Sequence, residues 1–112
     1  MEKSKKNPIL VMVVDDSAVV RGLVSRMLDK DDNIEVVDTV SNGELAVKRV
    51  NDIDLDVIIL DIEMPVMDGL TALPKILEIN PNIKVIMAST LTMKNAEISL
   101  KALQAGAADY IA

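Results

Sequence analysis

Several side chains that often carry chemistry or fill a core are missing from this sequence. It has no cysteine, histidine, tryptophan or phenylalanine, and one tyrosine. The lack of cysteine excludes disulfides, zinc–thiolate sites and thiol catalysis. The lack of histidine excludes the commonest general base and a phosphohistidine in this chain. Aliphatic residues and seven methionines must therefore fill the core of a chain that is 50% hydrophobic.

Charge and hydropathy narrow the range of partners. The formal net charge is −6, which disfavours nonspecific binding to nucleic acid. No segment has the length or the flanks of a signal peptide or a membrane span, so we expect a cytoplasmic protein without direct contact to nucleic acid or membrane.

A length of 112 residues suits one domain. We expect this domain at residues 9–112, after a basic tail at residues 1–8.

Short apolar segments alternate with amphipathic ones along the chain. Runs rich in β-branched residues predict strands at 9–14, 34–40, 57–60, 83–88 and, beginning a fifth, 109–112. Helices are expected after Asp16 or Ser17, from a capping box at 41–44 to about Val50, from Gly69 to Asn80, and from Thr92 to about Ala105. This alternation predicts a doubly wound five-stranded parallel sheet. The mixed polarity of 34–40 predicts an edge strand.

Two of these helices show a clear apolar face. Helical spacing predicts that the first buries Val20, Leu23, Val24, Met27 and Leu28. The same reasoning predicts that the helix after Gly69 buries Leu70, Leu73, Ile76 and Leu77. Pro74 deletes one backbone hydrogen bond of that helix unless the helix begins near Thr71.

Carboxylates follow two of the predicted core strands at the point where each strand ends. Asp15 and Asp16 follow the first, and Asp61 follows the third. If these strands are parallel neighbours, three carboxylates meet at one sheet edge, where two charges about 4 Å apart repel by roughly 4 kcal/mol at an effective dielectric constant near 20. Hard oxygen ligands without histidine or cysteine favour Mg²⁺, and a carboxylate can also act as a nucleophile. Alternatively, each aspartate simply caps a helix or a turn.

Four motifs in order along the chain resemble the receiver domain of two-component response regulators. They are VVDDS at 13–17, LDIEMPVMDG at 60–69, MAST at 87–90 and AGAADY at 105–110. The string Asp-x-x-Met-Pro-x-x-Asp-Gly is highly specific, whereas the acidic pair alone is not. The resemblance implies a flavodoxin-like strand order, 2-1-3-4-5. It also implies activation by phosphoryl transfer from a sensor histidine kinase, with Mg²⁺ as cofactor and an output domain or partner protein.

The resemblance also implies a role for individual residues. Asp61 corresponds to the phosphoacceptor, Asp16 to a direct Mg²⁺ ligand with Asp15 beside it, and Glu63 to the residue whose backbone carbonyl binds the metal. Ser89 corresponds to the hydroxyl that binds the phosphoryl group. Tyr110 corresponds to the aromatic switch residue, although an ordinary aromatic at the edge of the core is an equally good interpretation.

A narrower resemblance is to the regulatory domain of chemotaxis protein-glutamate methylesterases. It depends on DDSAVVR at 15–21, LDIEMPVMDGL at 60–70 and STLT at 89–92. The esterase domain of that family uses a Ser-His-Asp triad. Because this sequence has no histidine, we expect that the chain as given is not an enzyme, although a longer protein containing it could be a methylesterase.

Two other functions compete with a phosphorylation switch. A Mg²⁺-dependent phosphohydrolase with a nucleophilic aspartate would need a second aspartate two residues later, and Glu63 occupies that position. A flavin or dinucleotide binder would need glycines in the turn after the first strand, and residues 15–18 contain none.

The family carries a lysine that would come directly after Ala112, followed by a fifth helix. We therefore expect either a C-terminally truncated receiver domain that lacks its final helix, or a form that lacks efficient phosphorylation and signalling. The uncovered sheet face would then be apolar. Because large exposed apolar patches usually find a partner, we expect such a form to self-associate or to be marginally stable.

Overall fold

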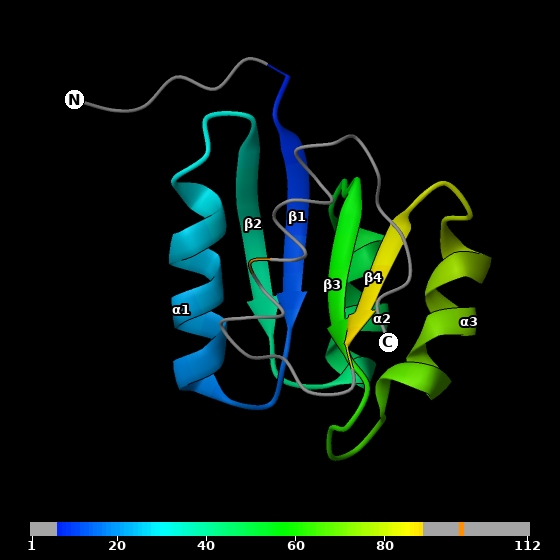
Figure 1. Cartoon of the computed structure of the whole chain (residues 1–112). Helices are drawn as coiled ribbons and strands as arrows, with labels where there is room; N and C mark the ends of the chain where they lie inside the picture. The colour runs from blue at the N-terminus through cyan, green and yellow to red at the C-terminus, as the bar shows by residue number, and fades with distance from the viewer. Residues whose placement is uncertain (1–6, 89–96, 98–112) are drawn as a thin grey trace.

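The computed structural model describes residues 7–88 and residue 97, and it has a parallel sheet flanked by helices (Figure 1). The elements in chain order are β1 (Ile9–Val14), α1 (Ala18–Asp29), β2 (Ile34–Val40), α2 (Gly43–Asp52), β3 (Val57–Asp61), α3 (Gly69–Ile79) and β4 (Lys84–Ala88). Their sheet order is β2-β1-β3-β4. This confirms the predicted α/β fold class, and it confirms β2 as an edge strand. Apart from residue 97, the predicted helix at 92–105 and the predicted strand at 109–112 lie outside the described residues.

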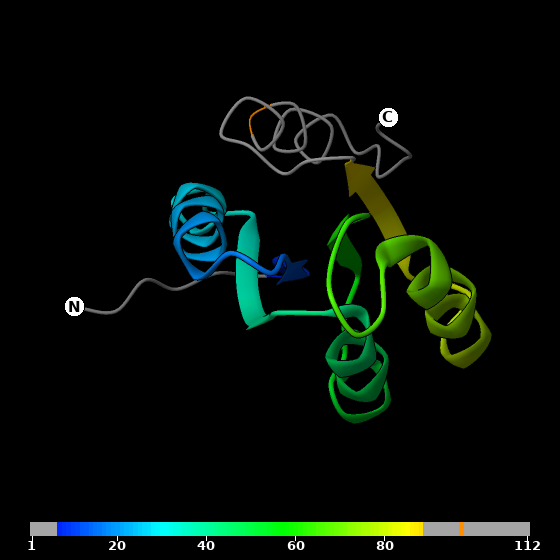
Figure 2. The ribbon, with the colours of Figure 1, turned by 90° about the horizontal axis from the view of Figure 1, so that it is seen from below.

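Helices cover both faces of the sheet (Figure 2): α1 lies on one face, and α2 and α3 lie on the other. The core is correspondingly divided. Val11 and Val13 of β1 join the cluster beneath α1, whereas Met12 and Val14 join the cluster beneath α2 and α3. This alternation follows from the period of two in a strand. A strand that is buried on both faces is apolar throughout, as the sequence of β1 is.

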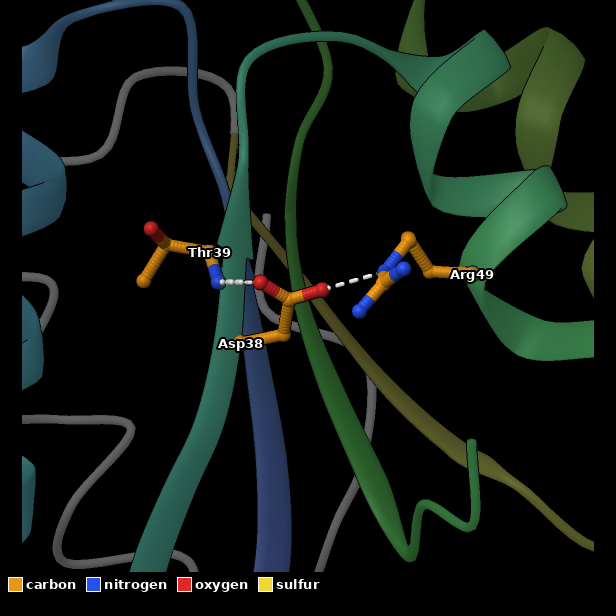
Figure 3. A network of polar contacts seen from close by, with 3 residues as sticks. All are labelled: Asp38, Thr39 and Arg49. Atoms are coloured by element: carbon orange, nitrogen blue, oxygen red, sulfur yellow. Dashed lines mark hydrogen bonds and ion pairs between the residues drawn. The ribbon is translucent and has the colours of Figure 1, made fainter. Parts of the chain in front are cut away.

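Strand β2 contains a bulge next to its polar residues Asp38 and Thr39. Val11 pairs with Val36, but Met12 pairs with Asp38, so Val37 is an extra residue in the ladder. The Asp38 carboxylate accepts hydrogen bonds from its neighbour Thr39 N, at 2.9 Å, and from Arg49 Nε of α2, at 2.5 Å (Figure 3). The ion pair therefore connects α2 to the edge strand.

Side chains cap the N-termini of all three described helices. Ser17 Oγ accepts from Val20 N at 3.3 Å, Asn42 Oδ1 accepts from Leu45 N at 2.9 Å, and Asp68 Oδ1 accepts from Thr71 N at 2.7 Å. The predicted capping box led by Ser41 is therefore wrong by one residue. Asn42 is an equally good cap. Glu44 then lies in the first turn, where its negative charge interacts favourably with the helix dipole.

The prediction of inward-facing residues is wrong at two positions. Leu23 of α1 is 39% exposed, and Leu70 of α3 is 57% exposed. Ala72 instead is fully buried where α3 approaches α2. A close approach between two helices selects small residues at the contact, and this turns Leu70 outward.

None of the helices that the structure describes is long and apolar enough to cross a membrane.

Candidate functional site

The acidic cluster forms because β1 and β3 are adjacent parallel strands that end at the same level. Val14 pairs with Leu60, so the next residues, Asp15 and Asp61, emerge side by side at the carboxyl edge of the sheet. Carboxylate oxygens of Asp15, Asp16 and Asp61 lie within 4.8 Å of one another. The structure therefore brings together the three aspartates that the sequence singled out, at the edge where open α/β sheets place their ligands.

Burial and mutual repulsion disfavour the charged forms of two of these aspartates. Asp15 is 3% exposed and Asp61 is 5% exposed, whereas Asp16 is exposed. Burial, then the negative charge of Asp15, raises the pKa of Asp61 to about 7. Burial likewise raises the pKa of Asp15, assisted by the charge of Asp16. Backbone N–H groups of Glu63 and Ile62 oppose the shift at Asp61 and hold its pKa lower than burial alone would.

One oxygen of Asp61 has no partner among the described residues. Its Oδ1 is buried and accepts no hydrogen bond there, although leaving a buried acceptor unsatisfied costs about 1–3 kcal/mol. A cation beside Asp15, Asp16 and Asp61 would satisfy this oxygen and offset the repulsion among the three carboxylates. An all-oxygen donor set suits a hard divalent ion such as Mg²⁺, so the residues present fit the cofactor that the sequence predicted.

Neighbouring groups of α1 hold Asp15, and sequence reasoning missed them. Ser17 N donates to Asp15 Oδ1 at 2.7 Å, and Arg21 Nη1 donates to the backbone carbonyl of Asp15 at 2.7 Å. The guanidinium of Arg21 also opposes the rise in the pKa of Asp15. The signal that could have identified Arg21 is its position one helical turn after Ser17, which returns its side chain to the end of β1.

The loop between β3 and α3 is tightly constrained directly after Asp61. Gly69 N donates to the Ile62 carbonyl at 2.8 Å, which closes the loop. Val66 has φ 68°, and Met67 N donates to the Pro65 carbonyl at 2.7 Å. This is a γ-turn with positive φ, a strained geometry that is rare for a β-branched residue.

Of the remaining predicted site residues, the structure describes Glu63 only. The side chain of Glu63 is exposed, and its backbone lies beside the Asp61 carboxylate. Ser89 and Tyr110 lie outside the described residues. Asp68, the other aspartate of the motif, caps α3, and the backbone N–H of Thr71 holds the pKa of its carboxyl below the usual range.

Comparison with known proteins finds similar sequences among protein-glutamate methylesterases. A protein-glutamate methylesterase/protein-glutamine glutaminase from Rhodospirillum rubrum is 65% identical over 105 residues, which are 94% of this chain and 27% of that protein. The corresponding protein from Azospirillum brasilense is 60% identical over 105 residues, with the same coverage of 94% and 27%. This chain thus spans about a quarter of the length of these relatives. The predicted resemblance to the regulatory domain of chemotaxis methylesterases is confirmed.

These relatives also overturn one prediction. We expected the chain not to be an enzyme, because it lacks the histidine of an esterase triad. The proteins that it matches at 60–65% identity are named as enzymes, and the matched part is about 27% of their length. A missing histidine in one segment says nothing about the rest of such a protein, and that is why the inference failed.

Solved structures agree on the fold. The response regulator domain of Thermotoga maritima CheB has a TM-score of 0.73 and is 40% identical, covering 93% of this chain and 77% of that chain. A chain of the CheX–CheY–BeF₃–Mg²⁺ complex from Borrelia burgdorferi has a TM-score of 0.70 and is 31% identical, with coverage of 93% and 77%. The family model of the response regulator receiver domain matches residues 11–112. The chain therefore belongs to the response regulator receiver domain family.

Proposed function

We propose that Asp61 accepts a phosphoryl group from a sensor histidine kinase and that this modification switches an output. The observation that carries the proposal is the cluster of Asp15, Asp16 and Asp61, whose carboxylate oxygens lie within 4.8 Å of one another around a buried acceptor. No histidine is present in the chain, so a phosphohistidine donor must be a different segment or protein.

The same carboxylates would hold Mg²⁺. Asp15, Asp16 and Asp61 would supply side-chain oxygens, and Glu63 would supply its backbone carbonyl. When bound, the ion neutralises charge on the transferring phosphoryl group. The relative from the CheX–CheY–BeF₃–Mg²⁺ complex, whose name includes Mg²⁺, supports this cofactor.

The side chain of Asp61 performs the transfer. A carboxylate oxygen of ionised Asp61 forms a bond to phosphorus while the bond from phosphorus to the imidazole nitrogen breaks, and the electron pair stays on that nitrogen. Because burial raises the pKa of Asp61 to about 7, only part of the free protein holds this nucleophile ionised at neutral pH. The fraction of ionised Asp61 increases when the pH is raised, or when the charges of Asp15 and Asp16 are neutralised.

The remaining roles follow the family pattern. Ser89 would bind the phosphoryl oxygens, and Tyr110 would change its position with the modification. The receiver domain would span 9–112, after a basic tail at 1–8. Because the relatives are methylesterase/glutaminase proteins, we propose that the output is the catalytic part of such a cytoplasmic chemotaxis protein.

Labelling with a small phosphodonor tests the acceptor. The protein is incubated with acetyl phosphate and Mg²⁺, and the modified residue is located by borohydride trapping and mass spectrometry. We expect label on Asp61 alone and complete loss in Asp61→Asn. Asp68→Asn is the matched control, because asparagine also caps helices and the variant should keep its label. Label on Asp15, or label that persists in Asp61→Asn, would contradict the assignment.

A further inference from the structure

We propose that Gly43, at the start of α2, is a positioning residue for the Asp61 site. The absence of a side chain at Gly43 lets α2 hold the loop between β3 and α3 in the conformation that sets the backbone around Asp61. This inference rests on the proposed function, because its readouts concern Mg²⁺ and the phosphoacceptor.

The backbone of the loop lies directly against Gly43. Gly43 N donates to the Met67 carbonyl at 2.9 Å. A Cβ added at Gly43 would lie 2.6 Å from Met67 O, 2.9 Å from the Cβ of Ala72 and 3.1 Å from Asp68 O. Two of these three atoms are backbone carbonyl oxygens, which cannot rotate away as a side chain could. A side chain at Gly43 therefore displaces the loop or the helix that bears it.

A displacement of the loop between β3 and α3 reaches Asp61 because hydrogen bonds constrain the loop at both ends. On one side of Met67 is the γ-turn centred on Val66, closed by the bond from Met67 N to Pro65 O at 2.7 Å. On the other side, Gly69 N donates to Ile62 O at 2.8 Å. A Cβ added at Gly69 would overlap the Asp61 carbonyl oxygen. The loop is thus held between α2 and the end of β3.

The groups at the far end of the loop act directly on the site. The N–H groups of Ile62 and Glu63 stabilise the ionised Asp61 carboxylate, and Glu63 is the expected carbonyl ligand of Mg²⁺. When the loop moves away from α2, these groups move relative to Asp61. Altering the partners that orient a metal ligand typically weakens metal affinity by about 10–100-fold.

The test compares Gly43→Ala with Gly22→Ala. At Gly22, in α1, the nearest atom to an added Cβ is Nη1 of the Arg26 side chain at 3.3 Å, a flexible group. We expect Gly43→Ala to shift the amide NMR signals of Ile62 and Glu63 in the metal-free protein. We also expect it to lower Mg²⁺ affinity and the rate of labelling by acetyl phosphate by about tenfold. Gly22→Ala should leave the amide signals of Ile62 and Glu63 in place, and should keep Mg²⁺ affinity and the labelling rate within about twofold of the wild type, as expected for a site without shared partners.

A second variant separates positioning from helix packing. Gly43→Ala/Ala72→Gly removes the overlap with the Ala72 side chain but keeps the overlap with Met67 O. We expect it to fold more stably than Gly43→Ala while Mg²⁺ affinity stays about tenfold low. Recovery of wild-type Mg²⁺ affinity in this variant, or unchanged affinity in folded Gly43→Ala, would overturn the inference. Wild-type protein that takes no label at all would instead refute the proposed function.

Discussion

The acidic cluster and the ion pair on β2 use aspartate in opposite ways. Asp38 on the edge strand meets the guanidinium of Arg49 at 2.5 Å and accepts a second bond from Thr39 N. Asp61, at the end of a central strand, meets two other carboxylates and keeps one oxygen without a partner among the described residues. The contacts of Asp38 stabilise its charged form, whereas the surroundings of Asp61 destabilise its charged form.

This difference indicates that the surroundings of Asp61 serve a function and do not serve stability. A fold selected for stability alone would place an apolar or paired residue where Asp61 lies, because a buried unpaired carboxylate is costly. Perturbed titration together with a clustered charge is typical of functional sites. The cluster should therefore reduce the stability of the metal-free protein, whereas the ion pair should increase it slightly.

Replacing Asp61 should give the largest change in stability. The pKa of Asp61 is about 7 in the folded protein and near 3.8 in the unfolded chain, so the folded state binds the extra proton. Stability from this group is present below about pH 4 and is lost as the pH rises to about 7. In EDTA at pH 8, Asp61→Asn should raise the free energy of unfolding by about 2–4 kcal/mol relative to the wild type.

Urea denaturation at several pH values measures this effect. The advantage of Asp61→Asn should shrink between pH 8 and pH 5, because protonated Asp61 carries no charge to repel Asp15 and Asp16. Asp68→Asn is the control, since Asp68 lies outside the cluster and should show no such gain. An Asp61→Asn protein that is less stable than the wild type at pH 8 would contradict the electrostatic interpretation of the site.

Breaking the ion pair should give the smallest change. Arg49 and Asp38 are partly exposed, at 42% and 23%, so solvent screens their attraction and the pair should contribute about 0.2–1 kcal/mol. A double-mutant cycle with Asp38→Ala and Arg49→Ala isolates this coupling, which should decrease further in high salt. A coupling above about 2 kcal/mol would show that solvent screens this pair less than surface pairs are usually screened.

The sequence was sufficient to predict the strand ends and therefore the position of the cluster of Asp15, Asp16 and Asp61. Apolar runs that are buried on both faces have few alternative structures, and an aspartate that follows such a run must lie at the edge of the sheet. Parallel pairing of β1 with β3 then brings Asp15 and Asp61 together. The local pattern contained this information before any tertiary contact was known.

The details that escaped prediction depend on how elements approach one another. The outward position of Leu70 and the burial of Ala72 follow from the close contact of α3 with α2, which helical periodicity does not contain. The significance of Gly43 likewise depends on the carbonyl of Met67, 24 residues away along the chain. A glycine in the first turn of a helix gives no such signal by itself.

Mg²⁺ titration of stability tests the central claim most directly. The free energy of unfolding is measured at pH 8 over increasing Mg²⁺, with NaCl at matched ionic strength as the control for screening. If Asp15, Asp16 and Asp61 hold the ion, wild-type stability should rise by about 1.4 kcal/mol per tenfold increase in Mg²⁺ above the dissociation constant. Asp16→Asn/Asp61→Asn should lose this response. A flat wild-type curve, or the same rise in both proteins, would contradict the account.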